Sequence, residues 1–425
     1  MAQQLYFSRD SKMWIEFDGV VWEVPVLDGF SFSQSTNSSE ITLAEMESSA
    51  GVSRRGRRAF NDSLAPGEWS FSTYIRPFVS AGNGFAGSNR DADGAAEVHA
   101  VEEILWAMLA GAKNYNTSTY AYDAADTGPT AVTTPAATQS VVSFAGSNSS
   151  TLGTFNIYFV LGNANQLVYK LEGCTANEAS IDFDIDGIAT VAWSGNSNQV
   201  IDFTANTSFA TSAPTSGAGS AVGDVHIDTD DSNKLSVVLT ANGGSHTPVI
   251  REAVLDTTNF IRNRLTQLTI VPASTDPDGD GANELAASYT VTLTGGNITI
   301  SNNITYITPE ELGQVNIPIG HVTGTRAVSG SMTCYLVDDT SNATSSRDLF
   351  NNLQALQNVV TNDFTLTFKI GGSTASTKRL EVAMPNCHLE IPTHSVEDVI
   401  SLETNFMSLP TTIDDKDEVT LTYKV

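Results

Sequence analysis

The sequence predicts a mainly β protein with flanking helices, organised as two tandem domains that arose by internal duplication. Short apolar runs alternate with polar residues at the period of a β-strand. Long Ser, Thr, Asn and Gly stretches separate these runs in a chain of 425 residues that is 40% hydrophobic and only 16% charged. Matching elements also follow one another in the same order in both halves, as a tandem duplication produces.

The strand predicted at Glu68–Ile75 is the element through which the two halves are best compared. Apolar and small polar residues alternate along it, as in a sheet with one buried face. Its segment Ser70–Ile75 aligns with Ser331–Leu336, and each position keeps its chemical character except Thr73, which corresponds to Cys334.

Two hairpins are predicted at matching places. Trp14–Val24 should turn at Asp18-Gly19, a residue pair whose backbone suits a tight hairpin turn. Tyr289–Ile300 should do the same around Gly295-Gly296. A turn-rich joint is expected at Asn61–Gly67, before the Glu68 strand.

Two helices are also predicted in matching places. Ala95–Ala112 places apolar residues at helical spacing and acids in its first half, and Gly111 is the expected stop. Its counterpart is Ser345–Val359, with Ser345 or Ser346 as the N-cap.

The remaining strands complete the repeat. Phe155–Gly162 matches Phe364–Gly371 in its apolar positions, and strands are also expected at Leu167–Gly173 and Ser180–Ser194. The low-complexity segment Asn114–Ser150 is expected to be an exposed, mobile loop. The predicted organisation is a first domain over residues 1–202, a Ser/Gly/Thr-rich linker or embellishment over 203–259, and a second domain over 260–425.

Composition excludes several classes of function. A formal charge of −27 argues against binding nucleic acid by phosphate neutralisation. Three distant cysteines form neither a disulfide framework nor a zinc spacing, which favours synthesis in a reducing compartment. No signal peptide and no membrane span is expected. No metalloprotease pattern, phosphate loop or nucleophile elbow occurs, so we expect a protein that is not an enzyme.

One segment could bind a metal ion. In Thr275–Glu284 the side chains of Asp276, Asp278, Asp280, Asn283 and Glu284 could provide oxygen ligands for Ca²⁺. The segment is not an EF-hand loop, because Ala287 stands where a bidentate Glu is required. A solvated acidic turn is the alternative, and no other cofactor is expected.

Two charged clusters suggest surfaces. Arg54, Arg55, Arg57 and Arg58 are concentrated in an otherwise acidic chain, and they form either a solvated charge run or a contact to acidic residues of a neighbouring subunit. A second cluster forms an acidic stripe on one strand face, opposite Phe183 and Ile185. Its residues are Asp182, Asp184 and Asp186.

These features together resemble the major tail tube proteins of long-tailed bacteriophages. The resemblance is carried by the Arg54–Arg58 and Asn61-Asp62 stretch before the Trp69–Ile75 strand, by one helix beside each set of strands and by the two hairpins. It is greatest to the duplicated type, in which one chain carries two tube domains and trimers form pseudo-hexameric rings. It covers about residues 1–200 and 260–425.

The resemblance implies a structural virion protein made in the host cytoplasm. Each domain would be a β-sandwich with a helix beside it, and hairpins from all domains would join into a closed barrel. Stacked rings would form the tube through which DNA leaves, along an electronegative wall to which Asp182, Asp184 and Asp186 would contribute. Tape measure, terminator and baseplate or tip proteins would be its partners. The alternative is a secreted or surface β-sandwich adhesin with a calcium-binding loop.

Overall fold

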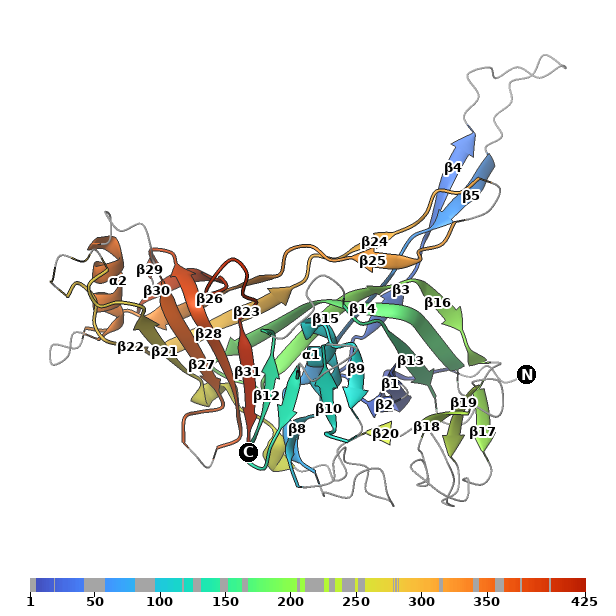
Figure 1. Cartoon of the computed structure of the whole chain (residues 1–425), viewed down its shortest axis with the longest axis horizontal. Helices are drawn as coiled ribbons and strands as arrows, with labels where there is room; N and C mark the ends of the chain where they lie inside the picture. The colour runs from blue at the N-terminus through green and yellow to red at the C-terminus, as the bar shows by residue number, and fades with distance from the viewer. Residues whose placement is uncertain are drawn as a thin grey trace, which may run out of the picture.

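The computed structural model of the chain describes most of its residues. They are residues 5–18, 20–41, 58–80, 96–116, 118–124, 131–145, 152–162, 167–204, 207–210, 225–228, 234–238, 249–250, 257–277, 279, 281, 283–312, 316–338, 344–355, 363–374, 377–396 and 399–425. Within them the fold is mainly β, with two α-helices, α1 (Glu103–Ala110) and α2 (Ser346–Ala355) (Figure 1). The predicted class is confirmed.

An antiparallel sheet of eight strand positions runs through both halves of the chain, and we call it the central sheet. The first half contributes its first four strands and the second half the rest. In spatial order they are β3 (Ser31–Ser33), β6 (Gly67–Tyr74), β15 (Thr190–Ser197), β14 (Leu167–Asp184), β23 (Leu293–Ser301), β26 (Ala327–Tyr335), β30 (Ile400–Ser408), and the end of β28 (Arg379–Leu389) continued by β29 (Thr393–Val396).

The pairing of β14 with β23 joins the two halves inside this sheet. It runs from Glu178 opposite Ser301 to Asp184 opposite Gly295. Backbone hydrogen bonds therefore connect strands that lie more than a hundred residues apart in the sequence, and the two halves share one continuous layer.

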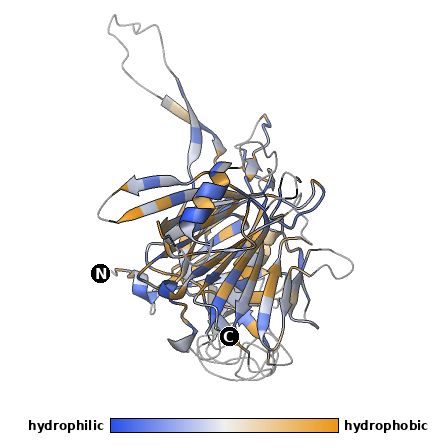
Figure 2. Ribbon diagram, turned by 90° about the vertical axis from the view of Figure 1, so that its left-hand side faces the viewer, coloured by the Kyte–Doolittle hydropathy of each residue, from blue (hydrophilic) through white to orange (hydrophobic). Residues whose placement is uncertain are grey.

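Each half also has an outer sheet that packs behind the central one. In the first half the order is β2 (Val20–Glu23), β1 (Ser11–Phe17), β13 (Phe155–Leu161), the first part of β14, and β16 (Gln199–Asp202). Behind the second half it is β22 (Tyr289–Val291), β21 (Gln267–Pro272), β27 (Phe364–Ile370), the first part of β28 and β31 (Thr420–Lys424). Two strands from the first half, β12 (Gln139–Ser143) and β11 (Thr133–Pro135), extend this sheet beyond β31. Apolar residues fill the interior (Figure 2).

The long strands β14 and β28 pass from the outer sheet into the central one through the same irregularity. Cys174 pairs with Phe155, and Cys387 pairs with Phe364, and in both cases the register shifts at the next pair. Each buried thiol donates to the carbonyl three residues earlier, at 3.4 Å from Cys174 to Leu171 and at 3.8 Å from Cys387 to Met384. A β-bulge bends a strand, which explains how one strand serves two layers.

Helix α1 is shorter than predicted and is buried on every side. Val98–Ala100, placed in the helix by the sequence, forms strand β8 and pairs with β7 (Pro77–Val79). The expected stop is confirmed, because Gly111 adopts a left-handed conformation at φ 90°. A helix surrounded by sheets does not need a polar face, and this explains why amphipathic spacing alone misplaced its start.

Helix α2 forms where the sequence predicted it, and residues 356–359 of that prediction lie outside the described part. Ser345 is its cap: its hydroxyl and backbone N–H both donate to Asp348 Oδ2, at 2.6 and 3.0 Å. The Asp348 N–H in turn donates a hydrogen bond to Ser345 Oγ at 3.3 Å. This is the reciprocal pattern of a capping box.

The first predicted hairpin is confirmed as β1 and β2. The second prediction is wrong, because β23 continues straight through Gly295 and Gly296 without turning. A Cβ on Gly296 would lie 2.9 Å from the Phe183 ring and 2.5 Å from Ser331 O. Glycine is required here for close packing between strands and not for a turn.

Strands occur in three segments where none was predicted: the turn-rich joint, the low-complexity loop, and the linker or embellishment. The joint at Asn61–Gly67 is mostly β5 (Arg58–Leu64), which pairs with β4 (Thr36–Ile41). The segment Asn114–Ser150 contains β11, β12, β9 (Asn114–Asn116) and β10 (Ala121–Asp123). It becomes ordered because β12 pairs with the C-terminal strand β31 and buries Val142 and Phe144.

The third of these segments lies in residues 203–259, where short strands and one turn are described. They are β17 (Thr207–Ala210), β18 (Val225–Asp228), β19 (Lys234–Val238), β20 (Val249–Ile250) and the 3₁₀ turn η3 (Thr257–Asn259). Two further 3₁₀ turns are η1 (Ser8–Asp10) and η4 (Asn263–Leu265). In the described residues no helix is long and apolar enough to span a membrane.

Candidate assembly and channel surfaces

One face of the central sheet packs on the core and the other faces solvent. Along β6 the residues Trp69, Phe71 and Thr73 are buried, while Ser70 and Ser72 between them are only half-buried. The same alternation continues across the other central strands, so the buried apolar residues fix which side chains reach the solvent face.

The solvent face carries hydroxyl, amide and carboxylate groups. No Lys or Arg occurs at any paired position of the central sheet. Six carboxylates extend from this face. They are Glu68, Glu178, Asp182, Asp184, Glu390 and Glu403. Since fixed charges of one sign on a continuous surface add their fields, this face carries a negative potential.

The acidic stripe predicted on β14 is partly confirmed. Asp182 and Asp184 are exposed, and Phe183 between them is 4% exposed. The prediction for Ile185 is wrong, because β14 ends at Asp184 and Ile185 lies in the following turn, 40% exposed. Asp186 lies in the same turn, with its Oδ1 3.9 Å from the Arg264 guanidinium.

Among the described residues, neither outer edge of the central sheet has a partner strand. In the described residues β3 pairs only with β6, and β29 pairs only with β30. Unpaired N–H and C=O groups on such an edge favour pairing with another strand. The equivalent edges in the middle of the sheet, on β14 and β23, already pair with each other.

Two β-arms extend from the same end of the central sheet (Figure 1). The long arm is β4 with β5, between β3 and β6; the short arm is β24 (Thr305–Ile307) with β25 (Gly320–Val322), between β23 and β26. The arms occupy matching positions in the two halves. They touch through a bond of 2.8 Å from Leu64 N to Asn316 O.

The base of the short arm is fixed to the first half by Tyr306. Its hydroxyl lies 2.8 Å from Gly173 O, 2.9 Å from Thr175 Oγ1 and 3.1 Å from Asn196 O. The short arm, which belongs to the second half, is therefore hydrogen-bonded to the first half.

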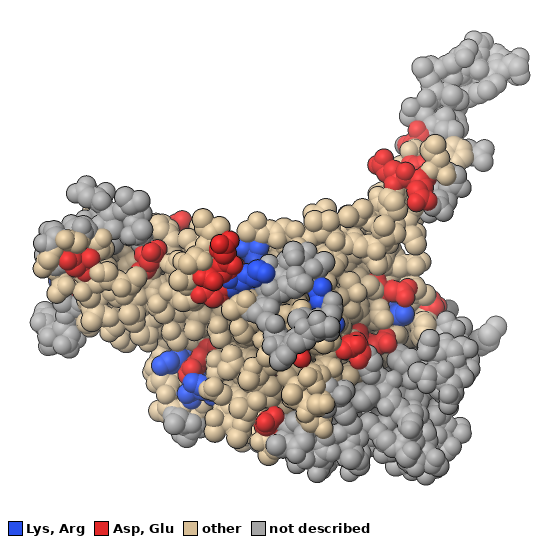
Figure 3. All heavy atoms as spheres, in the orientation of Figure 1, with Lys and Arg blue, Asp and Glu red and all other residues tan. Residues whose placement is uncertain are grey.

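Only one residue of the arginine cluster lies in the described part of the long arm. Arg58 is the first residue of β5, and the structure does not describe its side chain. Arg54, Arg55 and Arg57 lie outside the described residues. Acidic side chains gather on the described part of the arms, as Figure 3 shows. The exposed ones are Glu40, Asp62, Glu310 and Glu311.

The candidate calcium segment is only partly described, since Asp278 and Asp280 lie outside the described residues. Asp276 uses both carboxylate oxygens to accept backbone N–H groups, from Gly279 at 2.8 Å and from Gly281 at 2.9 Å. Asn283 accepts from Thr275 Oγ1 at 3.0 Å. No group of three or more metal-ligating side chains occurs in the part that is described. These bonds organise an acidic turn, and calcium binding stays a prediction.

Three features of these surfaces were not predicted from the sequence. They are the edge strand β29, the short arm, and the place of Glu390 and Glu403 on the acidic face. The internal repeat could have revealed them. Cys174 and Cys387 hold matching positions and stand 213 residues apart, and the strands that follow them, β15 and β30, match at almost the same spacing.

Comparison with known proteins gives a match over most of the chain. The chain is 29% identical over 400 residues to the tail tube protein pb6 of Escherichia phage T5, covering 93% of this chain and 69% of that protein. No family model matches. A chain of the cryo-EM structure of the anti-feeding prophage baseplate, symmetrised sixfold, is 8% identical, with a TM-score of 0.23 over 34% of this chain and 89% of that one.

Proposed function

We infer that this chain is a major tail tube protein of a long-tailed bacteriophage, and that it forms the structural tube of the virion tail. The similarity to the phage T5 tail tube protein over 93% of the chain supports this, and so does the mainly β fold. The same similarity disfavours a secreted adhesin with a calcium loop. DNA would leave through the tube, and the partners would be tape measure, terminator and baseplate or tip proteins.

We propose that three chains close into a ring through the two open edges of the central sheet. One chain supplies eight strand positions and two quasi-equivalent halves, so three chains would give a barrel of about 24 strands with pseudo-sixfold symmetry. The observation that carries this proposal is the β14–β23 junction. This junction pairs the outermost central-sheet strand of the first half, β14, with the outermost one of the second half, β23. Neighbouring chains would have to pair their edge strands in the same way.

The junction also gives the register of the proposed contact. Glu68 and Ser329 hold matching positions in the repeat. Glu68 pairs with Ser33 and Ser329 pairs with Thr299, so Ser33 corresponds to Thr299. At the internal junction Thr299 faces Ser180, whose hydroxyl lies 3.3 Å from that of Thr299.

The counterpart of Ser180 in the second half follows from the neighbouring strands. Ser180 pairs with Ala192, and Thr393 pairs with Glu403. Ala192 pairs with Ser72, and Glu403 pairs with Thr333. Ser72 and Thr333 match in the repeat, so Thr393 corresponds to Ser180. Thr393 of one chain should therefore face Ser33 of the next.

Oxidative cross-linking tests the ring. A variant with Ser33→Cys and Thr393→Cys should form disulfides between chains and give covalent dimers and trimers on a denaturing gel, with nothing larger. The matched control, Ser180→Cys with Thr299→Cys, should form its disulfide within one chain and migrate as a monomer. Absence of the intermolecular disulfide, or a ladder of covalent oligomers that reaches six chains, would contradict the trimeric ring.

A further inference from the structure

The two ends of the central sheet differ, and both expose apolar residues. We call the end that bears the arms the arm end, and the opposite end the rim. On the arms the exposed apolar residues are Phe60, Ile307, Leu312, Ile317, Ile319 and Val322. At the rim they include Ile185, Ile188, Leu265, Tyr335 and Val337. Concentrations of exposed apolar side chains mark contact surfaces.

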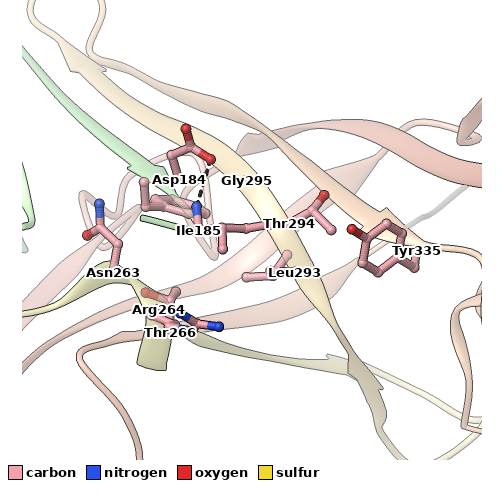
Figure 4. A pocket seen from close by; sticks show the side chains of 10 residues that line it. Asp184, Ile185, Asn263, Arg264, Thr266, Leu293, Thr294, Gly295 and Tyr335 are labelled. Atoms are coloured by element: carbon pink, nitrogen blue, oxygen red, sulfur yellow. Dashed lines mark hydrogen bonds between the residues drawn. The ribbon is translucent and has the colours of Figure 1, made fainter. Parts of the chain in front are cut away.

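A pocket lies at the rim, where the two halves meet. It holds about 140 Å³, close to the roughly 150 Å³ that accepts a benzene-sized group. Phe183, Ile185 and Leu293 give it apolar walls, and the charged side chains of Asp184 and Arg264 also line it. Figure 4 shows Ile185 in the turn after β14, Leu293 at the start of β23 and Arg264 in turn η4 around the pocket.

Two polar atoms in the pocket have no partner within the described part of the protein. Asn263 Oδ1 and Thr266 Oγ1 are buried without a hydrogen bond, and both residues line the pocket. Burying a polar atom without a partner costs free energy. The pocket is therefore suited to a ligand that combines an apolar group with hydrogen-bond donors.

The tip of the short arm has these properties. Leu312 is fully exposed, at 104% of the reference area, and it directly follows the exposed Glu310 and Glu311. A leucine in a turn brings an apolar side chain together with backbone N–H donors. The two glutamates also complement the exposed guanidinium of Arg264, which lines the pocket and lies 3.9 Å from the exposed Asp186, and the exposed Arg262 that precedes Asn263.

We propose that Leu312 of each chain inserts into the rim pocket of a chain in the next ring of the tube. This inference rests on the proposed ring. Identical rings that stack in one direction place the arm end of one ring against the rim of the next, and such a head-to-tail contact repeats without limit. Glu310 and Glu311 then lie near Arg262 and Arg264.

Substitution of the arm residue tests the contact. Leu312→Ser should leave the monomer and the ring intact, because the side chain is fully exposed within the chain. It should raise the protein concentration needed for tube growth by about tenfold or more, since each contact loses one buried leucine. The matched control is Ile413→Ser, an equally exposed apolar residue at 99% of the reference area outside the arms, which should form normal tubes.

An introduced disulfide tests whether Leu312 contacts the rim pocket of another chain. Leu312→Cys with Thr294→Cys should cross-link chains in assembled tubes and not in isolated rings. The nearby Cys334 should not interfere, because burial raises the pKa of its thiol to about 11.

The outcomes separate the two proposals. Normal tubes from Leu312→Ser, or a disulfide between the two introduced thiols in single rings, would overturn this inference while leaving the ring intact. Failure of the cross-link between positions 33 and 393 would instead count against the ring itself.

Discussion

Glu102 is a carboxyl group buried in the core where the two halves meet. It accepts a bond from the Tyr423 hydroxyl at 2.5 Å, and Tyr423 accepts one from Trp106 Nε1 at 2.6 Å. The Arg76 backbone N–H also points to it, at 3.4 Å. These bonds link the first-half helix to the C-terminal strand, so the protonation of one side chain affects how firmly the halves are joined.

Stability should depend on the pH through this group. Burial raises the pKa of Glu102 from 4.5 to about 7. Below pH 4.5 the group is protonated in both folded and unfolded chains. Between pH 4.5 and 7 only the unfolded chain ionises, so stability falls as the pH rises, by on the order of 3 kcal/mol in full.

Comparison with Glu102→Gln isolates this effect, because the amide cannot ionise and its oxygen can still accept from Tyr423. Relative to the variant, the natural protein should lose unfolding temperature between pH 4.5 and 7. Thermal unfolding at several pH values measures the difference. Parallel curves for the two proteins would show that Glu102 does not contribute.

The long arm, β4 with β5, includes Arg58 of the arginine cluster, and the other three arginines precede it in the sequence. It extends from the body on the same side as the short arm (Figure 1). Four clustered cations repel one another unless acidic groups lie nearby. We propose that Arg54, Arg55, Arg57 and Arg58 contact acidic residues of an adjacent subunit or ring.

Changing all four arginines to serine should impair assembly and leave the monomer folded. Tube length in negative-stain images and thermal unfolding of the monomer measure the two effects. Because the contact is electrostatic, natural tubes should also shorten as salt rises. Normal tubes from the fourfold variant would mean that the cluster is a solvated surface.

At the scale of the whole molecule, the acidic face of the central sheet is the proposed wall of the channel. A closed barrel would turn this face inward, toward the passing DNA. The six carboxylates of each chain would repel phosphates over about 8 Å at physiological salt. Assembled tubes should therefore not bind short duplex DNA under these conditions.

Charge reversal tests the wall. Asp182→Lys with Asp184→Lys should make tubes bind a labelled duplex, with an affinity that falls as salt rises. The control, Asp10→Lys with Asp414→Lys, makes the same change in charge outside the central sheet and should not bind it. Anisotropy of the labelled duplex is the measurement. Equal binding by both variants, or tight binding by the natural tubes, would contradict an electronegative wall.

Local patterns in the sequence were sufficient where neighbouring residues decide the outcome. Strand β6 and the exposure of Asp182 and Asp184 follow from alternation, and the start of α2 follows from Ser345 and Asp348. The matching strands Phe155–Leu161 and Phe364–Ile370 are confirmed for the same reason. Side-chain period and capping act over a few residues, which a single sequence displays.

Only the tertiary structure decided what distant segments do to each other. Gly295-Gly296 reads as a turn, yet it lies within a strand because β14 and β26 hold it on both sides. The Thr- and Ala-rich stretch near Val142 is ordered because β31, almost three hundred residues later, pairs with it. The β14–β23 junction and the open edges have the same origin: backbone hydrogen bonds between strands carry no local sequence signal, so the partner is known only when the chain is folded.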